Sequence, residues 1–546
     1  MLYRQIAQSI EELSSAPRSC KADLCSRLIV EMKPELLCPT IRLLLGQLWP
    51  PWEGREMRVG PEGVAAALEE ISEENISLLR DRMGEMGLVA EAALAEKGQH
   101  SLSSEPLQSM SVYEQLRRIS LIRGKDSEQR KNALLRGLFQ DASPLEGKYI
   151  ARTVLGNMLA GIGDKTMLAA FALAFCCDPD QIHRAYSLLP DPGKIAIMAA
   201  GNHLERASIQ PGIPIKPMTL CALKAEDLKT VREVGEESVG WAVLPRYHAL
   251  RVQVHNTGDG AYIFSSRQKN ITTSLNGLAQ RLSGMDDEFI IDADLIGFHE
   301  GEMCSQSEML RYINRRRLSR RSSISPALLA YDLIYISGED TTSLPFQERR
   351  KRMLKALGEP RSMPFQGISA TRECIVLEKE LKKDSIQSHL DQMVEEGGVG
   401  LMVRSLLGLY RPGECSRCDF FVGREMSISA VIVRAEWGRR SSDQIFSRFL
   451  VALREGDDLV PVGWIGGQLG QKDILELDRQ LKALAREWDD TGACVNPQVL
   501  LKLKIQGARR NDKGYAIVRP QVLGIDLFAS WEDADELTRL FSSSGR

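Results

Sequence analysis

The sequence predicts a chain of three domains: an all-α domain, a mixed α+β domain and a small β-barrel, in that order. Three observations predict this fold class. The 546 residues exceed what one hydrophobic core usually organises, since domains span about 100–200 residues. Apolar residues recur at helical spacing until about residue 205, and strand-like alternation replaces this spacing from about residue 240. Further short alternating segments follow residue 425.

Residues 1–205 are expected to form the helical domain. Apolar side chains lie three to four positions apart in Ile10–Leu13 and Leu43–Leu48, whereas alternation is scarce. A polar stretch that begins at Lys97 predicts a loop within this domain. The proline-rich segment Gln210–Met218 cannot continue a helix and therefore marks the boundary.

Residues 206–424 are expected to form the α+β domain. Leu250–His255 alternates between apolar and polar residues, a glycine-containing turn follows at Asn256–Gly260, and Ala261–Phe264 alternates again, which predicts a hairpin. The other predicted elements are strands at Phe289–Phe298, Leu328–Ile336 and Gly398–Val403, and a helix at Gln347–Leu357.

Residues 425–546 are expected to form the barrel. The stretches ISAVIVRAEWG and RFLVALREGDDLVPVGWIGG have the alternation and turn residues of short barrel strands. A terminal helix is predicted over Asp533–Phe541.

Composition limits the function classes. The chain is 43% hydrophobic and 26% charged, with a net charge of −3, so any nucleic-acid binding must depend on local basic surfaces. The longest apolar run, Thr166–Cys177, is shorter than the ~20 residues that cross a bilayer. The first residues are amphipathic and lack the pattern of a signal peptide, so a cytoplasmic protein without membrane contact is expected.

Eleven cysteines are scattered without a framework, which is typical of a reducing compartment. The single CxxC pair, Cys415 and Cys418, has no second ligand pair at the spacing of a zinc site. Coincidence is the favoured interpretation of this pair.

Several segments in order resemble the ATP-dependent DNA ligases of the archaeal and eukaryal type, across nearly the whole chain. In the first two domains they are SPLEGKYIARTVLG, PGIPIKPM, FSSR, IIDADLIGF, YDLIYISG, LPFQERRKRML and VGLMVR. Each segment alone can be explained as a buried strand or an exposed basic helix, and for YDLIYISG and IIDADLIGF taken singly that is the better explanation. The ordered set is specific. The resemblance implies a helical DNA-binding domain, a nucleotidyltransferase (adenylation) domain and an OB-fold. Members of this family seal nicks in DNA replication, repair and recombination, with ATP and Mg²⁺ as cofactors.

The resemblance also implies where the catalytic residues stand. In this family a lysine amine attacks the α-phosphate of ATP and carries AMP. The matching position here is Arg246, whose guanidinium stays protonated up to a pH of about 12 and is no nucleophile. No lysine occurs between Lys229 and Lys269, so no shift of the alignment supplies one. Arg246 could still hold a phosphate, because arginine binds phosphate in a bidentate manner.

Other motif residues differ as well. Leu244 and Val399 stand where the family has glutamates, and Asp294 takes the place of a third, which leaves it as the one candidate metal ligand. Phe421 and Gly423 stand at the two phosphate-binding lysines of a late motif. The remaining departures from the family pattern are His248 and Cys415. We therefore expect poor Mg²⁺ binding and no covalent chemistry with ATP.

The family's nucleotide contacts are retained at Arg251, Arg267, Asp294 and Tyr331. For Tyr331 a place in the hydrophobic core is an equally good interpretation. In the helical domain Lys148 and Arg152 are the expected DNA contacts, although Asn157 and Leu159 replace two cations of the family motif. The other basic clusters are Arg311–Arg321 and the set Arg509, Arg510 and Lys513, which could equally be solvated faces.

The sequence thus favours a DNA ligase homologue that does not adenylate itself and binds double-stranded or nicked DNA weakly, without sequence preference, as a monomer. One alternative is an active ligase that uses an unrecognised nucleophile or nicks that are already adenylated. A second alternative is a protein-interaction scaffold without DNA contact, which is consistent with the net negative charge.

Overall fold

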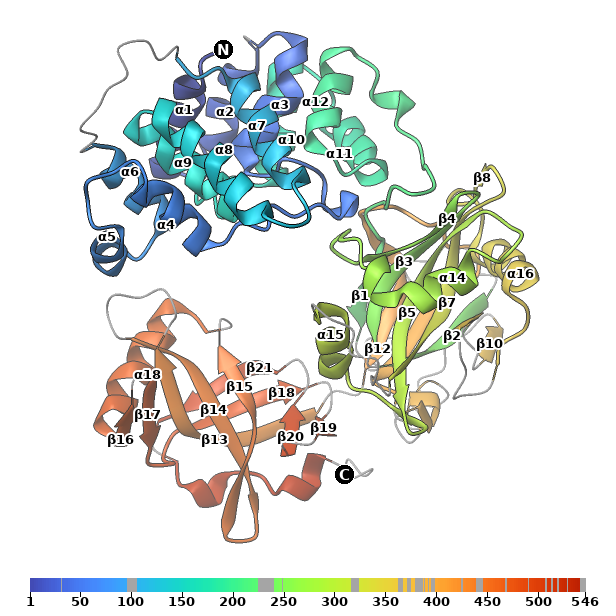
Figure 1. Ribbon diagram of the computed structural model, residues 1–546. Coiled ribbons are helices and arrows are strands. Elements are labelled where there is room, and N and C mark those ends of the chain that lie inside the picture. Colours follow the sequence, from blue (N-terminus) through green and yellow to red (C-terminus); the bar gives the residue numbers. More distant parts are fainter. Residues whose placement is uncertain are drawn as a thin grey trace.

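The computed structural model contains three bodies, one of helices and two built mainly of strands (Figure 1). It describes residues 1–540 except for 31, 96–105, 224–239, 248, 316–323, 362–366, 371–374, 379–385, 387, 391, 394–397, 424–425, 438–444, 467–468, 490, 506–507, 512–513, 518–519 and 528. The predicted loop after Lys97 lies almost entirely outside the described residues.

The helical part follows from helix signals in the sequence. α9 (Pro144–Leu155) begins with Ser143 and Glu146 as a capping box and ends at Gly156, whose φ of 68° suits glycine. The other helices are α1 (Tyr3–Ser15), α2 (Lys21–Val30), α3 (Pro34–Leu45), η1 (Pro51–Glu53), α4 (Pro61–Glu69), α5 (Ile76–Met83), α6 (Met86–Ala95), α7 (Ser109–Leu121), α8 (Ser127–Asp141), α10 (Asp164–Phe175), α11 (Pro179–Leu188), α12 (Pro192–Ala200) and η2 (Leu204–Arg206).

The α+β part has two sheets. The first has the order β4-β3-β5-β7-β8, with β6 beside β5 and β9 parallel to β7. Its strands are β3 (Leu250–Thr257), β4 (Gly260–Ser265), β5 (Phe289–His299), β6 (Glu302–Met303), β7 (Ser325–Ile336), β8 (Glu339–Asp340) and β9 (Gly367–Ala370). The second has the order β1-β12-β11-β2-β10. Its strands are β1 (Thr219–Leu223), β2 (Gly240–Arg246), β10 (Ile375–Glu378), β11 (Gly400–Ser405) and β12 (Cys415–Gly423).

Among the described residues, these sheets are accompanied by η4 (Thr272–Leu275), α14 (Asn276–Leu282), α15 (Gln306–Asn314) and α16 (Phe346–Leu357). The central strand β7 is buried on both faces, because Leu328 and Ala330 pack into one core while Tyr331 packs into another. The second core joins the two sheets, since it also contains Leu244 of β2 and Met402 of β11. Tyr331 therefore lies where both sheets meet.

The last part is a β-barrel with the sheet order β15-β14-β13-β17-β16, closed further by β18 on β13 and β21 on β18. Its elements are β13 (Met426–Trp437), β14 (Phe446–Glu455), β15 (Asp458–Gly466), α18 (Gln471–Ala483), β16 (Ala485–Asp489), β17 (Gly492–Val495), β18 (Leu500–Ile505), β21 (Gln521–Asp526), the hairpin β19 (Ala508–Asn511) with β20 (Gly514–Ile517), and the turns η5 (Trp531–Asp533) and η6 (Leu537–Leu540).

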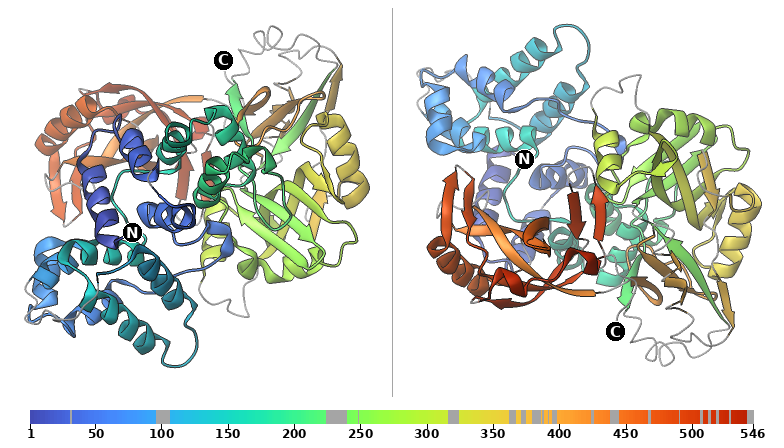
Figure 2. Two further views of the ribbon diagram at one scale, coloured as in Figure 1. Left: turned by 90° about the horizontal axis from the view of Figure 1, so that it is seen from above. Right: turned by 90° about the horizontal axis from the view of Figure 1, so that it is seen from below.

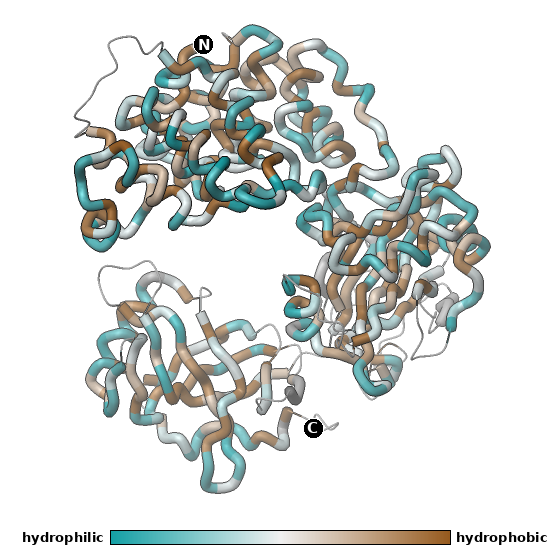
Figure 3. Tube along the Cα trace, viewed as in Figure 1, coloured by the Kyte–Doolittle hydropathy of each residue, from teal (hydrophilic) through white to brown (hydrophobic). Residues whose placement is uncertain are grey.

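The predicted fold class is confirmed: a helical part, an adenylation-type α+β part and an OB-like barrel follow one another. Hydrophobic residues concentrate along the inner strands and helix faces, while hydrophilic residues occupy many of the turns and outer faces (Figure 3). One element was predicted wrongly, because the expected helix over Asp533–Phe541 is replaced by two short 3₁₀ turns. Within the described residues no helix is long and apolar enough to cross a bilayer.

Candidate nucleotide site

A cleft of about 1030 Å³ opens between the two sheets of the α+β part. Its wall contains Arg246 at the end of β2, Arg251 on β3, Arg267 after β4 and Tyr331 on β7. Ile517 of the barrel also lines it. The fold therefore brings four of the predicted residues to one cleft, with a fifth, Asp294, bound directly to Arg246.

Arg246 is bound to a carboxylate, so its guanidinium is not free to bind a phosphate. Its Nη1 donates to both Oδ1 and Oδ2 of Asp294, each at 2.7 Å. Burial alone would lower the pKa of this guanidinium, but the Asp294 carboxylate and the Tyr331 hydroxyl together raise it. Burial raises the pKa of Asp294, and Arg246 offsets only part of that increase. The residue at the nucleophile position is thus a fixed cation with a buried partner.

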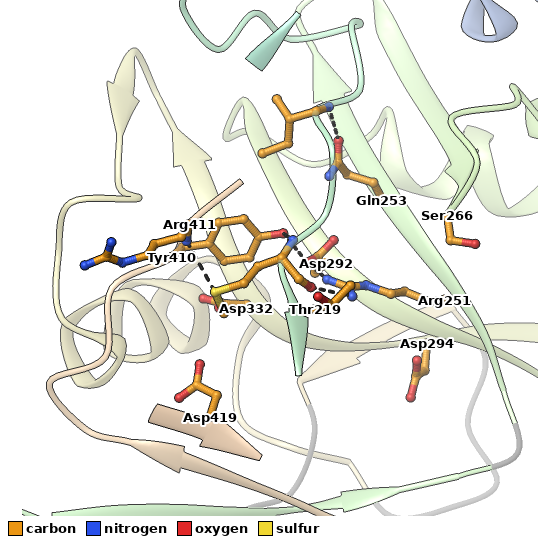
Figure 4. Close-up of polar contacts among 12 residues, drawn as sticks. Thr219, Arg251, Gln253, Ser266, Asp292, Asp294, Asp332, Tyr410, Arg411 and Asp419 are labelled. Carbon is orange, nitrogen blue, oxygen red and sulfur yellow. Dashed lines mark hydrogen bonds and ion pairs between the residues drawn. The ribbon is translucent and has the colours of Figure 1, made fainter. Parts of the chain in front are cut away.

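Arg251 forms a second ion pair of the same kind. Its Nη2 lies 2.6 Å from Oδ2 of Asp292, and its Nη1 donates to the carbonyl of Met218 at 2.6 Å. The hydroxyl of Tyr410 donates to the same Asp292 oxygen at 2.5 Å, as Figure 4 shows. Burial opposes the charge on Arg251, but Asp292 raises the pKa of the guanidinium well above its ordinary value. Arg251 therefore secures the segment before β1 to the sheet.

Tyr331 is 5% exposed, so the core interpretation describes its environment. The guanidinium carbons of Arg246 and Arg251 lie 5.7 and 5.8 Å from the centre of its ring. Burial raises the pKa of its hydroxyl, which keeps the phenol neutral. Both arginines thus contact the aromatic ring that the resemblance assigns to nucleotide binding.

Arg267 differs from the other predicted residues because it is exposed. It forms no ion pair with any described carboxylate, and it lines both the cleft and a second cavity of about 550 Å³ beside the helical part. Within the described residues, no carboxylate neutralises its charge. Of the predicted nucleotide contacts, Arg267 is the one that an anion reaches without breaking an ion pair.

Sequence reasoning missed a buried charge network in the wall of the cleft, which Asp332 and Arg404 line. Asp332 accepts from Nε of Arg349 at 2.8 Å and lies 2.8 Å from Nη2 of Arg404. Arg404 also pairs with Asp419 at 3.0 Å. All four side chains are at most 2% exposed. Burial raises the pKa of Asp332, but the two arginines outweigh it and lower that pKa. Alternating strand patterns give no signal for such partners, because they lie on different elements.

The positions of the missing motif residues are apolar in the structure. Leu244 is fully buried, and the amide of Val399 donates to the carbonyl of Arg246 at 2.8 Å. Val399 and Phe421 both line the cleft. These side chains bring no charge and no oxygen ligand to the site. His248 lies outside the described residues.

The residues present do not fit a divalent metal. Mg²⁺ prefers six oxygen ligands in octahedral geometry. In the part of the chain that the structure describes, no group of three or more His, Cys, Asp or Glu side chains is arranged to hold a metal ion. Asp292, Asp294 and Asp332 are each paired with arginine. The buried Asp292 Oδ1 has no hydrogen-bond partner, but a single oxygen makes no metal site.

Lys148 and Arg152, the predicted DNA contacts, lie inside the helical part. Their side chains are 8% and 9% exposed. Lys148 pairs with Glu11 at 2.8 Å and Glu91 at 3.2 Å, and Arg152 pairs with Glu85 at 3.0 Å. Their role in DNA binding stays a prediction, and these ion pairs neutralise the charge that a phosphate contact needs.

The other basic clusters are only partly described. Residues 316–321 of the run Arg311–Arg321, and Lys513, lie outside the described residues, as do the side chains of Arg509 and Arg510. Of the CxxC pair, Cys415 is an exposed free thiol and the side chain of Cys418 lies outside the description.

A helical part, a nucleotidyltransferase-type domain and an OB-like barrel together form the architecture of a nucleotidyltransferase, which is the class of protein that the fold defines. The family model for the DNA ligase N terminus matches residues 2–172, and that for the ATP dependent DNA ligase domain matches residues 223–418. A solved structure described as Pmar-Lig_PreS3 has a TM-score of 0.51 at 12% identity and covers 95% of this chain and 99% of that chain, which supports the fold.

Relatives in sequence extend over the whole chain. The DNA ligase of Thermococcus fumicolans is 28% identical over 566 residues, covering 99% of this chain and 98% of the relative. The DNA ligase of Thermococcus onnurineus (strain NA1) is 29% identical over 562 residues, covering 99% and 97%. The chain belongs to the ATP-dependent DNA ligase family and is homologous to its archaeal members.

Proposed function

We propose that this protein is a DNA ligase homologue that cannot form a lysyl-AMP and binds duplex DNA without sealing it, as a monomeric pseudo-ligase of the cytoplasm. The observation that carries the proposal is the ion pair between Arg246 and Asp294, at 2.7 Å, at the position of the nucleophile. Attack on ATP needs a neutral amine. A guanidinium paired with a buried carboxylate offers none.

The surroundings of Arg246 support the same conclusion. Stabilising the negative charge of a transferring phosphoryl group takes cations or a metal ion in the transition state. In this cleft Arg251 is committed to Asp292, while Val399 and Phe421 are uncharged. The residues present fit neither Mg²⁺ nor a covalent adenylate, so no step of the reaction is assigned to this chain.

A direct assay tests the proposal. Purified protein is incubated with α-labelled ATP and Mg²⁺, and label that stays covalently bound to the protein through a denaturing gel is measured. We expect no label, whereas the related Thermococcus ligase serves as the positive control. Label in stoichiometric amount would falsify the proposal and favour an unrecognised nucleophile.

A second assay addresses nicks that are already adenylated. The protein is added without ATP to a duplex that carries a 5′-adenylated nick, and sealed strand is measured on a denaturing gel. We expect no sealing above the rate without protein, because the cleft has no Mg²⁺ site within the described residues. Sealing would favour an active enzyme for the second half of the reaction.

Duplex binding separates the pseudo-ligase from a scaffold without DNA contact. Electrostatic DNA binding weakens as salt rises, with a slope set by the number of phosphate contacts. We expect Kd for a nicked and for an intact duplex to rise with salt. Binding that is undetectable, or independent of salt, would favour the scaffold.

A further inference from the structure

Three exposed cations cluster at the turn between α7 and α8. They are Arg123, Lys125 and Arg130, and none of them forms an ion pair with a carboxylate within the described residues. The turn itself contains one acidic residue, Asp126, and Glu128 follows in the first turn of α8. This local excess of positive charge contrasts with the net charge of −3 of the whole chain.

The turn is held by its own arginines. Nη2 of Arg130 donates to the carbonyl of Arg123 at 2.7 Å, and Nη1 of Arg123 donates to the carbonyls of Ser120 at 2.5 Å and Ile122 at 3.1 Å. Lys125 takes no part in these bonds through its side chain. Arg123 and Arg130 therefore fix the backbone conformation, and Lys125 is presented on a turn that is already ordered.

A fourth exposed cation, Arg58, lies at this turn because the buried Lys131 binds its backbone. Lys131 is 4% exposed, and its Nζ donates to the carbonyls of Met57 at 2.7 Å and Arg58 at 3.3 Å. The side chain of Arg58 is 62% exposed, and its contact with Glu56 is long, at 3.9 Å. The exposed cations Arg58, Arg123, Lys125 and Arg130 are called the basic turn.

Burial and two cations of the basic turn lower the pKa of the neighbouring Lys131. Burial lowers the pKa of Lys131, and the charges of Arg123 and Arg58 lower it further, while Glu128 acts in the opposite direction. The repulsion of Lys131 by these two arginines shows a local positive field, which Glu128 offsets only in part. An anion placed at this surface would relieve the repulsion.

We propose that the basic turn is the surface through which the helical part holds the sugar-phosphate backbone of duplex DNA. The proposal rests on the duplex binding proposed above and assigns it to a surface that the sequence did not single out. Lys148 and Arg152 would have to break ion pairs with Glu11, Glu91 and Glu85 before they reach a phosphate. The cations of the basic turn can contact a phosphate without breaking a strong ion pair. Phosphate contacts carry no base information, so the binding is independent of sequence.

A double variant tests the assignment. Lys125→Gln removes the presented charge, and Arg58→Asn removes a second one with a residue that tolerates the positive φ of 50° at this position. Arg123 and Arg130 are left in place because they hold the turn. The matched control is Arg206→Gln with Arg411→Gln, which removes two exposed cations with similarly long carboxylate contacts of 3.9 and 3.7 Å. Each variant is first compared with the wild type in thermal denaturation.

The readout is the slope of log Kd against log salt concentration for a short blunt duplex. The loss of two phosphate contacts lowers this slope by about 1.8, and the control pair should leave it within about 0.3 of the wild type. Equal losses in both pairs would show a diffuse field and overturn the assignment. An unchanged slope in the Lys125 and Arg58 variant, with the wild type still binding, would overturn the assignment but leave duplex binding intact. A wild type that does not bind would overturn both proposals.

Discussion

Each described aspartate of the cleft has an arginine as its partner, and these pairs determine what single substitutions do. Motif spacing identified Arg246, Arg251, Asp294 and Tyr331, because the family pattern fixes their order along the chain. It did not reveal that Arg246 binds Asp294, since the two residues are 48 positions apart and meet only when the sheet that contains β2 packs against the sheet that contains β5. Pairing across strands depends on tertiary structure, which a single sequence does not encode in its spacing.

A lysine placed at position 246 should not by itself support adenylation. In Arg246→Lys the amine would lie next to the Asp294 carboxylate, which favours its protonated form, and Val399 and Phe421 would still supply no charge. We expect no labelled AMP on the variant in the assay with α-labelled ATP and Mg²⁺. Labelling of the variant, with an unlabelled wild type, would show that one substitution caused the loss and would contradict this account.

The buried charge network in the wall of the cleft should contribute strongly to the free energy of unfolding. Asp332→Asn leaves Arg349 without its charged partner in an environment that is 0% exposed, and we expect a loss of about 3–5 kcal/mol in the free energy of unfolding. The control is Glu339→Gln, which removes an exposed partner of Arg352 and should cost less than about 1 kcal/mol. Urea denaturation measures both. A loss at Asp332 no larger than that of the control would contradict the prediction.

At the scale of an element, strand alternation predicted the strands correctly, whereas helical spacing predicted the last helix wrongly. The hairpin of β3 and β4 was predicted from its pattern and turn. Asp533–Phe541 has helical spacing, but the amide of Asp535 donates to Ser429 of β13 at 2.8 Å and its carbonyl accepts from Arg454 of β14 at 3.0 Å. These bonds to the barrel replace the intrahelical ones, which local spacing cannot predict.

The strand β3 also anchors the segment that follows the helical part. His255 is fully buried, its Nδ1 accepts from the amide of Gly212 at 3.0 Å, and its Nε2 lies 3.0 Å from Oε1 of Gln253. The same Gln253 oxygen accepts from the amide of Ile215 at 2.9 Å. An imidazole that accepts at Nδ1 is neutral, with its proton on Nε2.

This buried histidine makes stability depend on pH. Burial lowers the pKa of His255 to about 3, whereas the unfolded chain has the ordinary value near 6.5. The unfolded state therefore binds the proton first, and stability falls as pH decreases from about 6.5 toward 3. Between pH 7 and pH 5 the wild type should lose about 2 kcal/mol more than His255→Phe, which has no group to titrate there. Urea denaturation at both pH values measures this difference, and equal losses would contradict it.

At the scale of the molecule, the helical and α+β parts are connected by specific bonds. The amide of Lys216 donates to the carbonyl of Ser187 at 2.8 Å, and Nδ2 of Asn270 donates to the carbonyl of Trp52 at 3.3 Å. Both turned views in Figure 2 show the helices α1 to α12 as one body next to the α+β part. The order of the parts followed from changes in periodicity, whereas these connecting bonds join residues far apart in the sequence.

A nucleotide should not change the affinity of this molecule for DNA. Coupling between two sites requires that a ligand bind two states of the protein differently. Arg246 and Arg251 are already satisfied by Asp294 and Asp292, so the cations of the cleft that remain for ATP are the exposed Arg267 and Lys269, of which Lys269 lies 3.5 Å from Glu56. We expect Kd for a nicked duplex to change less than about twofold when ATP and Mg²⁺ are added, although typical coupling is about 5–150-fold.

The measurement is a duplex titration at one salt concentration, with and without ATP and Mg²⁺, and with Mg²⁺ alone to correct for its competition at the phosphates. Arg267→Gln is the informative variant, because Arg267 is the exposed cation of the cleft with no described carboxylate partner. A change in Kd of fivefold or more that disappears in this variant would show that the cleft still binds a nucleotide and transmits its binding to the DNA surface. A molecule whose ion pairs occupy the cleft should show the same Kd with ATP and Mg²⁺ as with Mg²⁺ alone.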